Sequence, residues 1–211
     1  MWARILVASV VLALGSSRVE AQILAVESTY NPAGTYYSYP ADSTYGWRFT
    51  VGDTPISVLR LGHFDVGLDG LQDSHQIGIW DTSGTLMVQT TVPAGTGGDL
   101  IGAYRFSLVP HTTLSANTTY LIGAYYPQQR DAAIAFDSPQ TYASEINYLG
   151  ASYFAASGFG PPGSSYSGTH GVFGPNLQLT AVPEPEYYAL MIGAGLIGFF
   201  LVRKCFGSAK V

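Results

Sequence analysis

The most restrictive feature of this sequence is an alternation of apolar and polar side chains between Thr44 and Tyr126. Trp47, Phe49 and Val51 are separated by single polar residues, which is the period of a strand with one buried face. The same period predicts a strand at Tyr120–Tyr126. Runs of this kind, joined by Gly, Pro, Asn and Ser turns, are typical of an antiparallel β-sandwich or jelly-roll fold. We therefore expect an all-β domain whose clearest part is residues 44–126.

The same reasoning extends over residues 22–181, which we assign to one ectodomain. Asp81–Gly84 is a turn-rich tetrapeptide between two apolar runs, and it predicts a β-hairpin. Residues 22–43 are interpreted as an irregular lead-in with one edge strand. Further strands are expected at Ile56–Asp65, Tyr104–Leu108, Ile134–Phe136, Ile146–Leu149 and Leu177–Thr180.

Charge and cysteine content exclude several classes of function. Between Gln22 and Val182 there are four Arg and no Lys against eleven Asp and Glu, a net charge of −7. Such a surface repels phosphate backbones, so we expect no nucleic-acid partner. The only cysteine is Cys205, beyond the ectodomain. An internal disulfide, a thiol nucleophile and a cysteine metal site are therefore excluded there, and the fold must be stabilised by its core.

Residues 1–21 have the three parts of a secretory signal peptide. Arg4 gives a positive start, Ile5–Leu14 forms an apolar core, and small residues precede a cleavage site. This apolar core is too short to cross a membrane as a stable helix. We predict that signal peptidase cleaves between Ala21 and Gln22. The alternative is an uncleaved N-terminal anchor.

The C-terminal segment, residues 182–211, predicts one membrane span. Tyr187–Val202 is an apolar run of sixteen residues, and as a helix it would rise about 24 Å against a bilayer core of about 30 Å. Arg203 and Lys204 follow this run and are expected to stop transfer on the cytoplasmic side. We therefore predict a transmembrane helix at about residues 187–202 in the inner membrane, with the ectodomain exported.

The segment also contains a recognisable order of motifs. Pro183, Glu184 and Pro185 precede the apolar run and the basic pair. Over Val182–Lys204 this order resembles the PEP-CTERM sorting tail of Gram-negative bacteria, which is also labelled an ice-binding protein C-terminal domain. The resemblance implies that a membrane-embedded exosortase recognises the Pro-Glu-Pro motif, cleaves the tail and couples export to an extracellular polysaccharide matrix. The alternative is a plain single-pass anchor.

A second set of motifs lies in the ectodomain: Tyr45–Phe49, Leu61–Asp65, Gly78–Asp81 with Ser83–Gly84, and Leu114 with Thr119–Tyr120. Through them, residues 44–126 resemble a domain of unknown function that is repeated in bacterial exported proteins, often near adhesin-like or carbohydrate-active modules. This resemblance implies a β-sandwich without a catalytic set.

Catalytic and metal-binding patterns are weak in the ectodomain. Gly163–Gly168 differs from the Gly-x-Ser-x-Gly nucleophile motif because a serine occupies the second Gly position, and it lies in a segment predicted to be a flexible loop. Asp65, Asp69 and Asp73 could hold calcium if their loop folded back. Their spacing is not that of an EF-hand, however, and a solvated loop is the alternative. We expect no catalytic activity and no cofactor, with calcium as the one metal candidate.

Tyrosine is abundant, with 15 residues, and exposed aromatic rings can stack on sugars. Adjacent residues of a strand point to opposite faces, so Tyr36, Tyr37, Tyr125 and Tyr126 are candidates for glycan contact; the alternative is that they are ordinary strand residues. The sequence therefore predicts a non-enzymatic structural or adhesive protein of the cell surface or extracellular matrix. A polysaccharide-binding module is the alternative, and a hydrolase with a hidden site is the third hypothesis.

Overall fold

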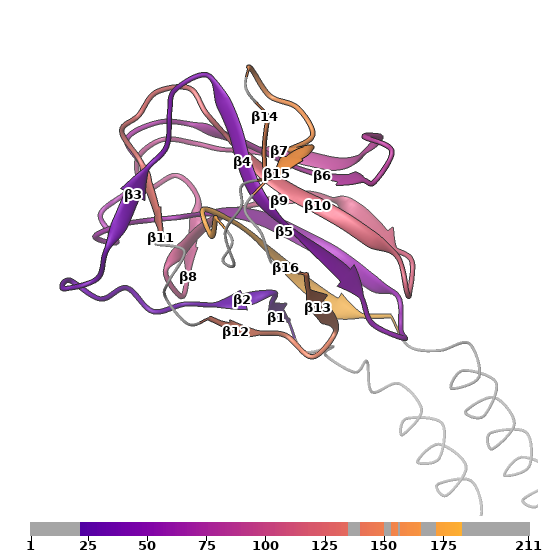
Figure 1. Cartoon of the computed structure of the whole chain (residues 1–211). Coiled ribbons are helices and arrows are strands. Elements are labelled where there is room, and N and C mark those ends of the chain that lie inside the picture. Colours follow the sequence, from indigo (N-terminus) through magenta and orange to yellow (C-terminus); the bar gives the residue numbers. More distant parts are fainter. Residues whose placement is uncertain (1–21, 135–139, 150–152, 156, 166–171, 183–211) are drawn as a thin grey trace, which may run out of the picture.

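The computed structural model describes residues 22–134, 140–149, 153–155, 157–165 and 172–182. Every helix or strand assigned in these residues is a β-strand (Figure 1), so the all-β prediction is confirmed for this part of the chain. The strands are β1 (Ile23–Leu24), β2 (Val26–Glu27), β3 (Tyr36–Ser38), β4 (Ser43–Val51), β5 (Ile56–Phe64), β6 (His75–Asp81), β7 (Leu86–Val92), β8 (Asp99–Ile101), β9 (Tyr104–Leu114), β10 (Thr119–Tyr126), β11 (Ala132–Ile134), β12 (Thr141–Tyr142), β13 (Ile146–Tyr148), β14 (Tyr153–Ala155), β15 (Ser164–Ser165) and β16 (Pro175–Ala181).

Both predicted targeting segments fall on residues that the structure does not describe. This applies to the signal peptide with Ala21, to the Pro-Glu-Pro motif at 183–185, and to the predicted span at 187–202 with its basic pair. Among the residues that are described, no helix has the length and hydrophobicity that a membrane crossing requires.

Two large antiparallel sheets form a sandwich-like arrangement (Figure 1). One sheet has the strand order β1-β16-β5-β9-β8, and the other has the order β15-β14-β4-β10-β6-β7, with β13 also paired to β4. The indole Nε1–H of Trp47 on β4 donates to the carbonyl oxygen of Pro175 on β16 at 2.9 Å, which joins the sheets. The main pairings are nested, since β1 pairs with β16, β4 with β10, β5 with β9, and β6 with β7.

The predicted alternation is confirmed in the strands at the centre of the fold. Trp47, Phe49 and Val51 are fully buried, and the residues between them are half-buried. The predicted hairpin is formed by β6 and β7, and Gly84 in its turn has a φ of 89°, a conformation that favours glycine. In β9 the alternation does not continue to Leu108, which is 68% exposed beside a register shift between β5 and β9.

The lead-in of residues 22–43 is more ordered than predicted, because it contains three short strands and covers one face of the five-stranded sheet. Its Ser28 accepts a hydrogen bond from the Tyr104 hydroxyl at 3.2 Å. Its Tyr36 stacks on Phe64 with ring centroids 5.6 Å apart. Phe64 and Tyr104 are cross-strand partners on β5 and β9, so they share the face that the lead-in covers.

The outer face of the larger sheet is also covered. Gly46, Gly123 and Gly78 are cross-strand partners on β4, β10 and β6 and form a row without side chains. A Cβ added to Gly78 would lie 2.9 Å from Phe159, and one added to Gly123 would lie 3.2 Å from Pro162. Phe159 and Pro162 belong to residues 157–171, the segment predicted to be a flexible loop, which therefore packs against this row through its described residues.

Candidate functional site

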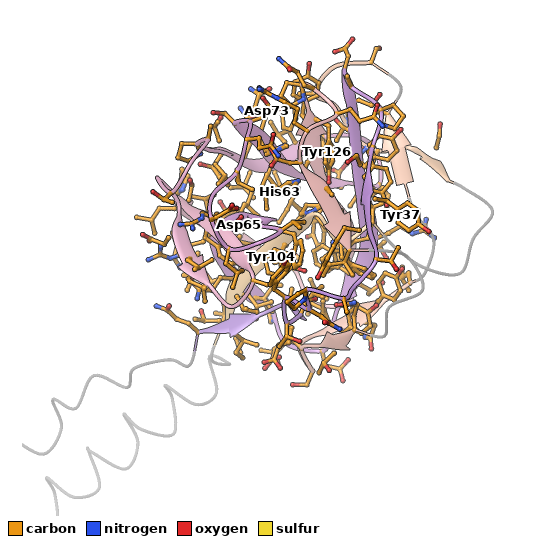
Figure 2. All side chains as sticks on the ribbon, turned by 90° about the vertical axis from the view of Figure 1, so that its left-hand side faces the viewer. Tyr37, His63, Asp65, Asp73, Tyr104 and Tyr126 are labelled. Carbon is orange, nitrogen blue, oxygen red and sulfur yellow. The ribbon has the colours of Figure 1, made fainter. Side chains whose placement is uncertain are left out.

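A cluster of polar side chains lies between the sheets, at the end where β5 finishes and β6 begins (Figure 2). His63 on β5 and His75 on β6 are both fully buried. Their rings stack, with centroids 3.9 Å apart and an angle of 11° between the planes. Tyr126 on β10 meets both rings edge-on. The two sheets thus bring together two histidines that are twelve positions apart in the sequence.

Asp131, just before β11, anchors this cluster. Its carboxylate accepts hydrogen bonds from His75 Nε2 at 2.9 Å and from the backbone N–H groups of Gln72 at 2.9 Å and Asp73 at 2.8 Å. Burial opposes ionisation of this carboxyl group, but the hydrogen bonds outweigh burial and lower its pKa below the ordinary value. Asp131 is therefore ionised at neutral pH.

The partners of His75 fix its protonation state. Nδ1 lies 2.9 Å from the carbonyl oxygen of Tyr125, and Nε2 lies 2.9 Å from the Asp131 carboxylate. Both partners are acceptors only, so both ring nitrogens of His75 carry a proton. His75 and Asp131 form a buried imidazolium–carboxylate pair. With both nitrogens occupied, His75 has no lone pair with which to act as a general base.

His63 is in the opposite state. Its Nδ1 donates to the carbonyl oxygen of Phe64 at 2.9 Å, and its buried Nε2 has no hydrogen-bond partner among the described residues. Burial, and then the neighbouring His75, lower the pKa of His63 well below its ordinary value. A neutral imidazole therefore stacks on a charged one.

Two arginine–carboxylate pairs flank the histidines. Arg105 Nε donates to Asp65 at 2.7 Å, and both partners are buried. Arg130 pairs with Asp73, whose carboxyl group is buried. Asp69, the third predicted calcium ligand, is exposed. In the described part of the chain no three acidic, His or Cys side chains are grouped for metal binding, so the structure does not bring these three residues together as one ligand set.

The four predicted glycan-contacting tyrosines lie in different surroundings. The prediction is wrong for Tyr126, which is fully buried because it lies on the inward face of β10. Tyr125 points the other way and donates to Asp42 at 2.9 Å. Tyr36 stacks on two rings, Tyr30 and Phe64, which restricts access to its faces. Tyr37 is 43% exposed.

A cleft of about 680 Å³ lies beside the lead-in. Its lining combines apolar groups with hydroxyl, amide and carboxylate groups, the latter from Glu27, Ser28, Asn31, Thr35, Tyr36 and Gln140. The Tyr36 hydroxyl is held at its edge, because it donates to the carbonyl oxygen of Asn31 at 2.8 Å and accepts the N–H of Asn31 at 3.0 Å. Such a lining can exchange hydrogen bonds with a neutral ligand that carries many hydroxyl groups.

Comparison with known proteins adds no functional information. No protein-family model matches the chain, and no curated protein matches it.

The sequence analysis did not identify Asp131, Arg105 and Arg130, because these residues meet their partners only through long-range pairing. Two features could have pointed to these ion pairs. The ectodomain has only four arginines, and charged residues are rarely buried without a partner.

Proposed function

We propose that this chain is an exported protein of the cell surface or extracellular matrix, and that its β-sandwich is a structural or adhesive module without catalytic activity. The single observation that carries the proposal is the order of motifs at the C-terminus. Pro183, Glu184 and Pro185 precede a sixteen-residue apolar run, and Arg203 and Lys204 follow it. Signal peptidase and an exosortase are the proposed processing partners, and the inner membrane holds the proposed intermediate.

An exported domain of this kind must be stable without disulfides. The ectodomain contains no cysteine, so its stability comes from a core that both sheets share and from ion pairs that hold its loops. We further propose that the sandwich is a jelly roll, because its four main strand pairings are nested like a long hairpin rolled into two sheets. A rigid body of this kind suits a matrix component.

The sorting proposal is tested by changing the motif alone. The full chain and a variant with Pro183→Ala, Glu184→Ala and Pro185→Ala are produced in a Gram-negative host that carries an exosortase. We expect the unchanged chain at the surface or in the matrix, and the variant as a full-length protein in the inner membrane. A Ser208→Ala variant is the control, since it changes the tail beyond the basic pair. Equal distribution of all three chains contradicts the proposal.

Polysaccharide binding is a second candidate function, and the cleft beside the lead-in favours it. Its hydroxyl and amide groups, with Glu27 as the one carboxylate among the described lining residues, suit a neutral glycan better than an anionic one. Affinity electrophoresis of the mature protein in gels that contain neutral or acidic polysaccharides tests this function. We expect a Glu27→Ala and Asn31→Ala double variant to lose retardation and an Asp53→Ala control to keep it. Equal mobility of the unchanged protein in all gels contradicts this function.

A further inference from the structure

The histidine stack joins parts of the chain that are distant in sequence. His63 comes from β5, His75 from β6 and Tyr126 from β10, while Asp131 precedes β11. Through the N–H groups of Gln72 and Asp73, Asp131 also holds the loop of residues 65–74. Asp131 therefore links His75 on β6 to the loop of residues 65–74.

The charges around His63 are balanced only while His63 is neutral. Three cations, His75, Arg105 and Arg130, face three anions, Asp65, Asp73 and Asp131. Tyr126, which faces His63 from β10, is neutral because burial raises its pKa well above the ordinary value. A proton on His63 would add an uncompensated positive charge beside the imidazolium ring of His75, 3.9 Å away between ring centroids.

The described residues around His63 offer no hydrogen-bond acceptor for that proton. His63 Nε2 has no acceptor among the described residues, so an N–H there would be buried without a partner. The backbone closes over the same atom, because a Cβ added to Gly174 would lie 3.2 Å from Nε2 and would overlap the hydroxyl oxygen of Tyr126. Relief of the charge therefore requires that the packing at this end of the sandwich opens.

We propose that the histidine stack is an acid-sensitive closure, in which protonation of His63 separates His75 from Asp131 and releases the loop of residues 65–74. The closed form is the ground state at neutral pH. The released form exposes Asp131, and it exposes Asp65 and Asp73 together with their arginine partners. A matrix that becomes acidic would thus change the surface that this protein presents at one end.

The sign of the pH effect follows from the lowered pKa of His63. A solvated histidine titrates near pH 6.5, and the closed form binds this proton only at lower pH. Below about pH 6.5 the open form therefore binds more protons than the closed form. As pH falls, the ratio of closed to open protein decreases about tenfold per pH unit, until His63 also titrates in the closed form. Asp131, whose pKa is lowered, adds its own effect only as pH falls below about 4.

Amide hydrogen exchange of the mature protein tests the closure. The readout is the protection of the Gln72 and Asp73 amides at pH 7.0, 6.0 and 5.0, corrected for the intrinsic exchange rate. We expect protection to fall about tenfold between pH 6 and pH 5 in the unchanged protein. A His111→Gln variant, which removes an exposed histidine, should behave in the same way, whereas a His63→Phe variant, which keeps a ring in the stack, should lose the dependence. Protection that is independent of pH in the unchanged protein overturns the proposal.

A second measurement needs no variant. The His63 ring signal of the unchanged protein is followed by NMR from pH 8 to pH 4. We expect His63 to titrate below pH 6.5 and to change in step with exchange at Gln72 and Asp73. Titration of His63 at or above pH 6.5, or titration without loss of protection, overturns the proposal even if the His63→Phe variant does not fold.

Discussion

Replacing Asn176 by alanine should detach the lead-in from the sandwich. Asn176 lies on β16 and is fully buried. Its Oδ1 accepts the N–H groups of Val26 at 3.1 Å and of Leu177 at 2.8 Å, and its Nδ2 donates to the carbonyl oxygen of Val26 at 2.8 Å. One side chain therefore supplies both backbone hydrogen bonds of Val26 on β2, which carries the lead-in.

The magnitude follows from the groups that lose their partner. Val26 and Leu177 are both fully buried, and a buried backbone group without a partner costs about 1–3 kcal/mol. Three such groups give an upper range of about 3–9 kcal/mol. Because the detached lead-in lets water reach β2, the lower end applies, and we expect a loss of about 3 kcal/mol in the free energy of unfolding. For a domain of this size that corresponds to a decrease of about 6–12 °C in Tm.

Thermal unfolding measured by circular dichroism gives the Tm, and limited proteolysis locates the change. We expect Asn176→Ala to lower the Tm by this amount and to expose residues 22–38 to cleavage first. Asn147→Ala is the matched control, since Asn147 lies on β13 with an exposed side chain. A Tm within about 2 °C of the unchanged protein, or proteolysis that spares the lead-in, contradicts this prediction.

Three further substitutions test the packing. In Gly46→Ala the new Cβ would overlap the carbonyl oxygen of Ile122, so we expect about 2–3 kcal/mol of destabilisation in urea unfolding. Gly160→Ala is the control, because a Cβ added there has nothing within 4 Å. Equal effects of the two substitutions would contradict the prediction. Tyr126→Phe removes a buried hydroxyl that has no partner among the described residues, so its Tm should stay equal or rise, and a clear decrease would argue against this environment. Leu108→Lys changes a side chain that is 68% exposed, so calorimetry should show a change within about 0.5 kcal/mol, and a larger loss would show that this side chain is covered.

The parts of the fold that the sequence predicts are those whose signal is local. The alternation around Trp47 and Phe49 identifies β4, because a half-buried strand imposes a period of two. The tetrapeptide Asp81–Gly84 identifies the hairpin, because its turn needs particular residues. Asn176 has no such signal, since its partner Val26 is 150 positions away. The order of residues 22–43 was missed for the same reason.

The candidate site was less predictable than the fold. Asp65, Asp69 and Asp73 are close in sequence, and this proximity suggested a calcium site. The partners of Asp65 and Asp73 are arginines from β9 and from the segment before β11, and the fold brings those elements together without a local motif. For the tyrosines, the two-residue period of a strand correctly predicted that Tyr125 and Tyr126 face opposite sides of β10. It could not tell which of the two points into the core.

The intact mass of the protein recovered from each cell fraction shows whether the chain is exported and whether its C-terminal tail is removed. A full-length chain expressed in a Gram-negative host with an exosortase is purified from the membrane, matrix and cytosolic fractions, and its intact mass is measured. We expect a product in the surface or matrix fraction that begins at Gln22 and lacks the apolar run at 187–202. An intact chain from Met1 to Val211 in the cytosol would contradict it.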